Sequence, residues 1–197
     1  MKNETKWSID PSHSEFAFRV RHLMIAHLRG SFKKFDASIY TVDSDFSTAE
    51  IDIWIDPASI TTGDFARDEH LKGPDFFDVK THRQIIFTSS SIGKPDATGN
   101  HELWGELTIK GITRNLKLNV TFGGIMKDPW GKEKAGFLIT GNLNRSDWGL
   151  NWNATLEAGG LLVSEDVQII CEVELVNAGK KDLVMELDTK ASQDGAM

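Results

Sequence analysis

The chain has little cysteine and no long apolar run, and each absence excludes a class of protein. The single cysteine, Cys171, has no partner for an internal disulfide, and it stands in an alternating apolar stretch, so we expect a small buried hydrophobe. No run of about 18 apolar residues is present to span a bilayer. Residues 1–6 lack the apolar segment of a secretion signal. As written, the sequence predicts a cytoplasmic protein, or a periplasmic one if a leader has been removed.

Positive charge is also scarce. Lysine and arginine number 22 against 29 acidic residues, which gives a net charge of -7 and a pI near 5.4. Such a surface predicts no nucleic-acid partner, because nucleic acids bind basic surfaces. It also opposes permanent residence on anionic lipid by charge. Transient contact with a membrane and assembly into a homodimer are left open.

The motifs of familiar catalytic and metal sites are missing as well. The chain has no CxxC, HExxH, GxSxG, GxGxxG or P-loop sequence. His22 and His27 are five residues apart, so a continuous strand would point them to opposite faces. Only convergence of His13, His22 and His70 in the fold would make a metal site. The sequence therefore predicts no metal, no cofactor other than a bound ligand, and no catalytic residue.

What the chain does have is alternation. Apolar residues recur at every second position in segment after segment, a period that is typical of half-buried strands. The short link at 110–115 contains Gly111 and predicts a hairpin, hence antiparallel order. These features predict one all-β domain, an antiparallel eight-stranded barrel that is closed or nearly closed. The expected strands are 16–22, 31–40, 49–55, 85–89, 103–109, 116–122, 137–143 and 167–175.

One stretch, 59–80, lacks this alternation. Within it, 64–72 predicts a short helical insert, because Gly73 and Pro74 follow as a stop signal. Outside the barrel, predicted at 7–176, we expect a flexible N-terminus at 1–6 and a loosely held polar tail at 177–197.

The insert carries a compact charged turn with Arg67, Asp68 and His70. These side chains could tie the insert to the barrel, with Arg67 and Asp68 as an ion pair. Alternatively, Arg67 could bind the polar head of a ligand, because a guanidinium offers a planar fork to oxygen atoms. Arg145, at a later strand end, presents the same two alternatives.

The predicted barrel is of the size at which the interior is either filled by side chains or holds one small ligand. Gly105 and Gly141 fall on the inward face, where a glycine often marks a place that another group approaches closely. The two glycines favour a cavity, although bends at barrel corners would also explain them.

Several motifs, in order along the chain, resemble the YceI-like family of lipid-binding proteins. Among them are WSIDPSHS at 7–14, FRVRH at 18–22, SITTG at 59–63, RDEHL at 67–71, FFDV at 76–79, GELTIKGITR at 105–114 and RSDWGL at 145–150. The resemblance covers about 7–176 and implies a lipocalin-like barrel that holds a polyisoprenoid, such as an isoprenoid quinone or polyprenyl phosphate. The chain departs from the family pattern at 81–83, where an aromatic residue followed by proline is usual.

The phase of the alternation selects the residues expected to line the lumen, and a slip by one residue would move a strand's whole set outside. The lumen set is Phe16, Phe18, Val20, Ile53, Phe87, Leu107, Leu118, Ile139, Ile169 and Val173. A second set is expected to bind the headgroup or fix a cap: His13, His22, Arg67, Asp68, His70 and Arg145.

Three hypotheses follow. The first is a non-catalytic module that binds, transports or stores an isoprenoid lipid or quinone. The second is a hydrolase or isomerase that uses a histidine as general base on a bound amphiphile. The third is a stress-response interaction protein whose barrel is fully packed with side chains.

Overall fold

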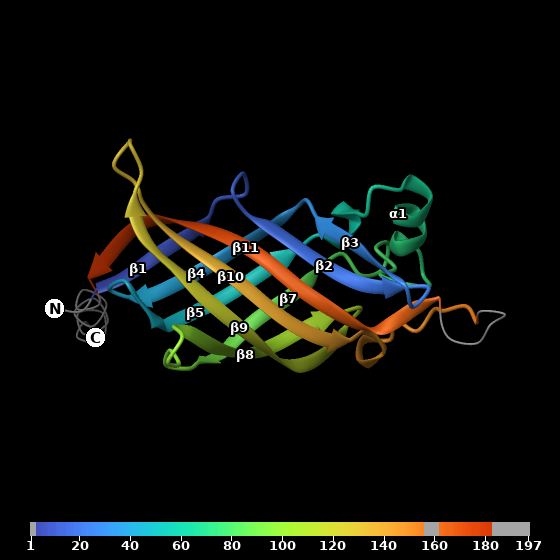
Figure 1. Ribbon diagram of the computed structural model, residues 1–197. Coiled ribbons are helices and arrows are strands. Elements are labelled where there is room, and N and C mark those ends of the chain that lie inside the picture. The colour runs from blue at the N-terminus through green and yellow to red at the C-terminus, as the bar shows by residue number, and fades with distance from the viewer. Residues whose placement is uncertain (1–2, 156–161, 183–197) are drawn as a thin grey trace, which may run out of the picture.

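The computed structural model describes residues 3–155 and 162–182, which form a β-barrel with one short α-helix at one end (Figure 1). The strands are β1 (Asn3–Ile9), β2 (Glu15–His22), β3 (Ala26–Phe32), β4 (Phe35–Val42), β5 (Asp45–Ile55), β6 (Ile60–Thr61), β7 (Ile85–Ile92), β8 (Asn100–Ile109), β9 (Ile112–Lys127), β10 (Glu133–Asn144) and β11 (Val163–Asp182). The helices are α1 (Phe65–Lys72) and the 3-10 turns η1 (Pro57–Ser59) and η2 (Arg145–Trp148).

The predicted architecture is confirmed: the strands close into an eight-stranded antiparallel barrel. Hydrogen bonds run around the ring in the order β1-β4-β5-β7-β8-β9-β10-β11, and β11 pairs again with β1. Since sequential strands are neighbours almost throughout, short hairpins suffice to connect them.

Eleven strand segments make an eight-stranded barrel, because three of the eight strands around the ring are each formed by two shorter segments. Both β1 and β2 pair with the same edge of the long strand β11, one after the other. Outside them, β4 pairs with β1 and β3 pairs with β2. The break between β3 and β4 falls at 33–34, inside the segment that alternation predicted as one strand.

Strands of the barrel continue past both predicted bounds, 7 and 176. The segment expected to be flexible, 1–6, belongs to β1 from Asn3 onward, and Thr5 is fully buried between β4 and β11. The tail expected from 177 is, as far as Asp182, the end of β11; the remaining residues, 183–197, lie outside the described part. These segments are held by main-chain hydrogen bonds of barrel closure, and polar side chains give no sign of such bonds.

The insert forms the predicted helix. In α1 the Asp64 side chain accepts a hydrogen bond from the backbone N–H of Arg67 at 2.9 Å, which caps the first turn. The helix ends at Gly73. Within the described residues, no helix combines the length and apolarity that crossing a membrane requires.

The end of the barrel opposite α1 is closed by aromatic packing. Trp7 is fully buried, and its Nε1 donates to Thr41 Oγ1 at 3.0 Å. Its ring lies 4.9 Å from that of Phe46, which also packs against Phe122 and Phe137 at 5.5 and 4.8 Å between centroids. Since β1 and β4 supply Trp7 and Thr41, this cluster locks the closing strand into the barrel.

We therefore expect Trp7→Ala to lower the free energy of unfolding by about 3–5 kcal/mol, because it removes a buried ring and leaves Thr41 without its donor. Urea unfolding followed by circular dichroism measures the change. Trp130→Ala is the matched control, since Trp130 is 83% exposed in the β9–β10 turn. An equal effect of the two substitutions would contradict this role of Trp7.

Candidate functional site

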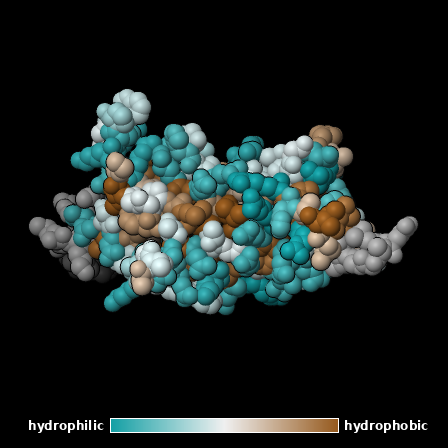
Figure 2. Space-filling view, in the orientation of Figure 1, coloured by the Kyte–Doolittle hydropathy of each residue, from teal (hydrophilic) through white to brown (hydrophobic). Residues whose placement is uncertain are grey.

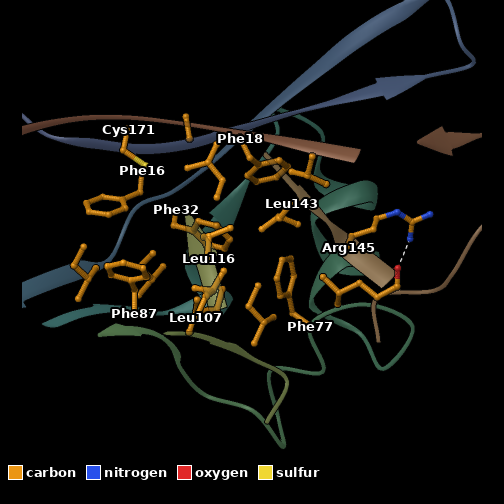
Figure 3. A pocket seen from close by; sticks show the side chains of 18 of the residues that line it. Phe16, Phe18, Phe32, Phe77, Phe87, Leu107, Leu116, Leu143, Arg145 and Cys171 are labelled. Atoms are coloured by element: carbon orange, nitrogen blue, oxygen red, sulfur yellow. Dashed lines mark hydrogen bonds between the residues drawn. The ribbon is translucent and has the colours of Figure 1, made fainter. Parts of the chain in front are cut away.

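The α1 half of the barrel contains a cavity of about 190 Å³. That is more than ten times the roughly 15 Å³ that one buried water needs on the same measure. Apart from Arg145 and Cys171, every lining residue is apolar. Figure 3 shows phenylalanine and leucine side chains converging on it from several strands. Such a cavity offers water no hydrogen-bond partners and suits an apolar molecule.

Nine of the ten residues predicted for the lumen line this cavity, so the predicted phase of the strands is right. Whether they touch a ligand stays a prediction. The tenth, Val173, lines a separate, smaller cavity of about 50 Å³ toward the closed end. Its phase is inward, but it lies farther along β11 than the main cavity extends. The nine are Phe16, Phe18, Val20, Ile53, Phe87, Leu107, Leu118, Ile139 and Ile169.

Several of these inward side chains are only half-buried. Ile53, Ile139 and Ile169 lie in the interior of the barrel wall, point inward, and still keep accessible surface. In a fully packed barrel such positions would have almost none. The surface they keep faces the cavity, so the interior is hollow.

The inward glycines are, as expected, places that another group approaches closely. A Cβ on Gly105 would collide with the ring of Phe87 and would lie 2.5 Å from the Thr88 carbonyl oxygen. A Cβ on Gly141 would lie 2.5 Å from a methyl group of Leu118. The groups that approach these glycines are neighbouring side chains of the wall. Because those side chains lie flat over a glycine, they take up less of the lumen.

Four side chains stand between the two cavities, and we call them the neck. Phe16, Leu103, Ile53 and Ile139 line both of them. Leu103 is 1% exposed and Phe16 is 6% exposed, so these two are held rigidly from opposite walls of the barrel. A linear molecule that enters from the α1 end would reach this neck with its far tip.

Asp68 and Arg67, two charged residues of α1, both bind Thr62. Asp68 is 9% exposed and accepts hydrogen bonds from the Thr62 backbone N–H at 2.8 Å and from its hydroxyl at 2.5 Å. Arg67 donates from Nε to the same hydroxyl at 2.7 Å and from Nη2 to the Thr62 carbonyl at 3.1 Å. A shared partner thus replaces the direct ion pair between Arg67 and Asp68, and Nε and Nη2 of Arg67 are engaged by Thr62.

Ionisation of Asp68 is favoured despite its burial. Burial alone raises the pKa of this carboxyl, but hydrogen bonds from Thr62 and Thr61 and the nearby charge of Arg67 outweigh it. The net pKa lies below the ordinary 3.8. Asp68 therefore fastens α1 to β6 as a carboxylate at neutral pH.

His70 fixes the other end of the cap. Its Nε2 lies 3.0 Å from Asp75 Oδ2, and its ring meets Phe76 and Trp152 edge-on at 5.2 and 4.6 Å between centroids. These contacts bind the last turn of α1 to the loop that follows it and to the 149–155 segment. The charged turn could either tie the insert to the barrel or bind a ligand's polar head. Its geometry fits the first alternative.

Arg145 lies at the α1 end of the cavity, 5% exposed. Its Nε donates to the Ser164 carbonyl at 2.9 Å, and its Nη1 donates to the carbonyls of Trp152, at 2.9 Å, and of Leu150. In Figure 3 the guanidinium points away from the cavity. Burial lowers the pKa of Arg145, partly offset by Glu165, yet arginine stays charged at neutral pH. Arg145 holds together the segments around the mouth.

The histidines whose convergence would make a metal site, His13, His22 and His70, lie apart in the fold. His22 ends β2 at the α1 end, whereas His13 lies in the 10–14 turn on the outer wall and is not among the lining residues. His13 sits 3.1 Å from Asp10 and 3.6 Å from Glu174. Lys134 binds both carboxylates, at 3.3 and 2.6 Å, so this cluster is an ion-pair network rather than a headgroup site. The placement of His13 beside the cap is wrong.

Sequence reasoning missed the lining residues that come from irregular segments. Leu71, Phe76 and Phe77 of the insert and Leu150, which follows η2, complete the wall at the α1 end. Period-two alternation cannot identify lining residues outside strands. The sequence signal for them was the pair of adjacent aromatics, Phe76 and Phe77, after the charged turn. Cys171, expected to be a buried hydrophobe, is 6% exposed and lines the cavity.

Closed at one end by aromatics and capped by α1 at the other, the molecule is a lipocalin-like β-barrel with an internal apolar cavity. The chain belongs to the YceI-like family, whose domain model matches residues 7–175. The resemblance inferred from the motifs is thereby confirmed.

Relatives and solved structures agree with this assignment. A UPF0312 protein of Staphylococcus aureus, strain MSSA476, is 37% identical over 171 residues, 86% of this chain and 96% of the relative. The YceI protein of Campylobacter jejuni has 32% identity and a TM-score of 0.69, over 81% of this chain and 90% of that one. BcnA of Burkholderia cenocepacia has 25% identity and a TM-score of 0.72, over 84% and 98%. A polyisoprenoid-binding domain from Saccharophagus degradans shares the fold, at 16% identity and a TM-score of 0.58, over 87% and 98%.

The cap yields a prediction about pH. Asp68→Asn should lower the free energy of unfolding at pH 7 by about 1–3 kcal/mol, because it weakens charge-assisted hydrogen bonds. The pKa of Asp68 is lowered in the folded state, so its contribution is complete above the unfolded value near 3.8 and is lost as the pH falls through the folded value. The difference between wild type and variant should therefore narrow on acidification below pH 3.8.

Urea unfolding at pH 7 and at several values below pH 3.8 measures this. Glu69→Gln, on the exposed face of the same helix, is the control and should change little at any pH, because its partner Lys72 forms a surface pair. A difference for Asp68→Asn that stays constant with pH would refute the proposed role of the carboxylate.

Proposed function

We propose that this protein binds an isoprenoid lipid, with the hydrocarbon tail in the cavity and without a chemical step, for transport or storage. The observation that carries the proposal is the apolar, hollow interior. The family assignment supports it, as does the shared fold with a domain described as polyisoprenoid-binding in Saccharophagus degradans.

The energetics of the cavity support an occupant. At about 24 cal/mol per Å³, an empty cavity of 190 Å³ costs roughly 4–5 kcal/mol relative to a filled core. Burying a tail returns about 0.8 kcal/mol per methylene, hence roughly 4 kcal/mol for a five-carbon isoprene unit. A few units therefore offset the entropy lost on association.

Of the two headgroups under consideration, a neutral quinone fits better than a phosphate. Arg145 carries the only positive charge among the described lining residues, and its donors bind main-chain carbonyls. Arg67 is likewise engaged by Thr62. A phosphate would have to break the contacts of Arg145 to bind it, whereas a neutral head needs no counter-charge.

The other two hypotheses find less support. A barrel fully packed with side chains does not agree with the cavity. For catalysis, the described lining residues include only two titratable side chains, Arg145 and Cys171. Burial raises the pKa of the Cys171 thiol to about 12, so the nucleophilic thiolate is scarce at neutral pH.

Adjacent residues of β10 test lipid capture. Ile139→Glu places a charge in the cavity and should reduce co-purifying prenyl lipid at least about tenfold, whereas Leu138→Glu, 40% exposed on the outer face, should leave it unchanged. Organic extraction of each purified protein and mass spectrometry give the amount and the headgroup.

Because a buried charge also unfolds proteins, Ile139→Trp serves as an uncharged second variant that fills the cavity, and circular dichroism checks all three. Wild type that carries no prenyl lipid and binds none when it is supplied would reject the proposed function. So would a folded Ile139→Trp that binds as well as wild type.

We expect the neck to limit the length of the lipid tail that the main cavity can hold. Leu103→Ala removes one of its walls and joins the two cavities, so the extracted lipids should shift to longer chains, at a stability cost of about 2–5 kcal/mol. Trp104→Ala, on the outer face of the same strand and 44% exposed, is the control. An unchanged distribution of chain lengths in folded Leu103→Ala would show that the neck sets no limit.

A further inference from the structure

Unusually exposed apolar side chains gather at the end of the barrel that carries α1. The turn between β2 and β3 presents Leu23, Met24 and Ile25, which are 38%, 52% and 86% exposed. Phe65, the first residue of α1, is 82% exposed. Figure 1 places both segments at the same end, and Figure 2 shows apolar surface there. We call residues 23–25 and Phe65 together the apolar rim.

The turn holds these side chains outward at a cost. Leu23 and Met24 have φ angles of 52° and 62°, in the left-handed region that glycine and asparagine favour and bulky residues avoid. The backbone is kept there by hydrogen bonds from Leu23 N to the Leu162 carbonyl at 2.9 Å and from Ile25 N to the His22 carbonyl at 3.2 Å. The left-handed angles at both central residues close the β2–β3 hairpin. Bulky apolar side chains are an unusual choice for such a turn, and their exposure marks a candidate contact surface.

The charge around the rim indicates what that contact is. Residues 16–35 include five lysines and arginines and no acidic residue, in a chain of net charge -7. Arg19 and Arg21 are exposed on β2, next to the turn, and form no ion pair within the described residues. Acidic groups of the neighbouring helix are engaged, as in the pair of Glu69 with Lys72. An apolar tip beside the exposed Arg19 and Arg21 is complementary to an anionic bilayer, which offers negative headgroups above hydrocarbon.

We propose that the apolar rim docks on anionic lipid bilayers, with residues 23–25 and Phe65 inserted at the boundary between headgroups and acyl chains. The cavity lies directly behind it. Val20, in the same strand two residues before His22, and Leu71, in the same helix as Phe65, both line the cavity. A lipid tail that leaves the bilayer at this point passes over continuous apolar surface. Docking does not require that the cavity be occupied, so it stands or falls separately from the proposed function.

Vesicle binding tests the proposal. The probe is co-flotation with vesicles of phosphatidylcholine containing roughly 30% phosphatidylglycerol, compared with phosphatidylcholine alone, at about 0.1 M salt. Wild type should bind the anionic vesicles. The double variant Met24→Asp/Ile25→Asp should bind at least about tenfold less, because it removes the inserting groups and adds like charge.

The matched control is the double variant Met126→Asp/Trp130→Asp, at the opposite end of the barrel. Met126 and Trp130 are 77% and 83% exposed, so this control changes similar side chains with similar burial and the same charge. It should bind vesicles like wild type. Arg19→Gln/Arg21→Gln should lower the preference for anionic vesicles by roughly fivefold for each charge.

Thermal unfolding gives a second readout that a purely structural turn would not produce. Aspartate and asparagine tolerate the left-handed region, so Met24→Asn should keep or raise the melting temperature while it lowers vesicle binding. A melting temperature that falls would mean that Met24 serves the fold.

Three results would overturn the proposal: no binding of wild type to anionic vesicles, equal loss in the two Asp double variants, or a change of oligomeric state in Met24→Asp/Ile25→Asp with unchanged vesicle binding. The last would make the rim a contact between copies of this chain. Ile139→Glu separates the two proposals, since it should lose extractable lipid and still bind vesicles. Vesicle binding lost in that variant would count against independent docking.

Discussion

Barrel closure through β11 is the constraint on which the rest of the structure depends. This strand pairs along one edge with β10 and along the other with β2 and then β1. Closing the sheet in this way satisfies the main-chain groups of the first and last strands, which would otherwise be exposed edges. It also places Trp7 against Thr41 and Phe46, so the same interaction plugs one end of the barrel. The cavity can then open only toward α1.

A hollow interior is stable here because its walls are rigid. Phe87 and Leu118 lie over Gly105 and Gly141, so bulky side chains pack against the wall and not across the lumen. The free energy that a filled core would have contributed is left for a ligand to supply. The shape of the cavity, apolar throughout and narrowed at Phe16 and Leu103, selects for a slender hydrocarbon chain over a polar molecule.

Buried and exposed charges at the α1 end have different roles. The buried ions at the α1 end, Asp68 and Arg145, are satisfied by Thr62 and by main-chain carbonyls, and they position the segments that surround the mouth. Arg19 and Arg21, which form no ion pair within the described residues, lie outside on β2. An apolar rim flanked by these two arginines agrees with the proposal that the protein meets anionic headgroups at its surface and holds hydrocarbon inside.

Much of the fold and of the cavity wall could be predicted from alternation, because side chains two residues apart on a strand share a face. Phe18, Ile53 and Ile139 were assigned to the lumen on that ground, and they line it. The headgroup and cap residues were harder to predict, because their roles depend on partners far away in the sequence. His13 meets Glu174, which is 161 positions later in the chain. No local pattern carries such a contact.

Local periodicity and turn residues were enough to predict strands β2, β4, β5 and β7 to β11, the helical insert and the apolar character of the interior. Only the tertiary structure decided that β1 closes the barrel, that Val173 lies beyond the neck, and that Arg145 binds carbonyls and not a ligand. It also decided that Leu23, Met24 and Ile25 stay exposed beside the mouth. The physical reason is that closure, cavity volume and the partner of a buried charge depend on pairings between distant segments, which exist only once the chain has folded.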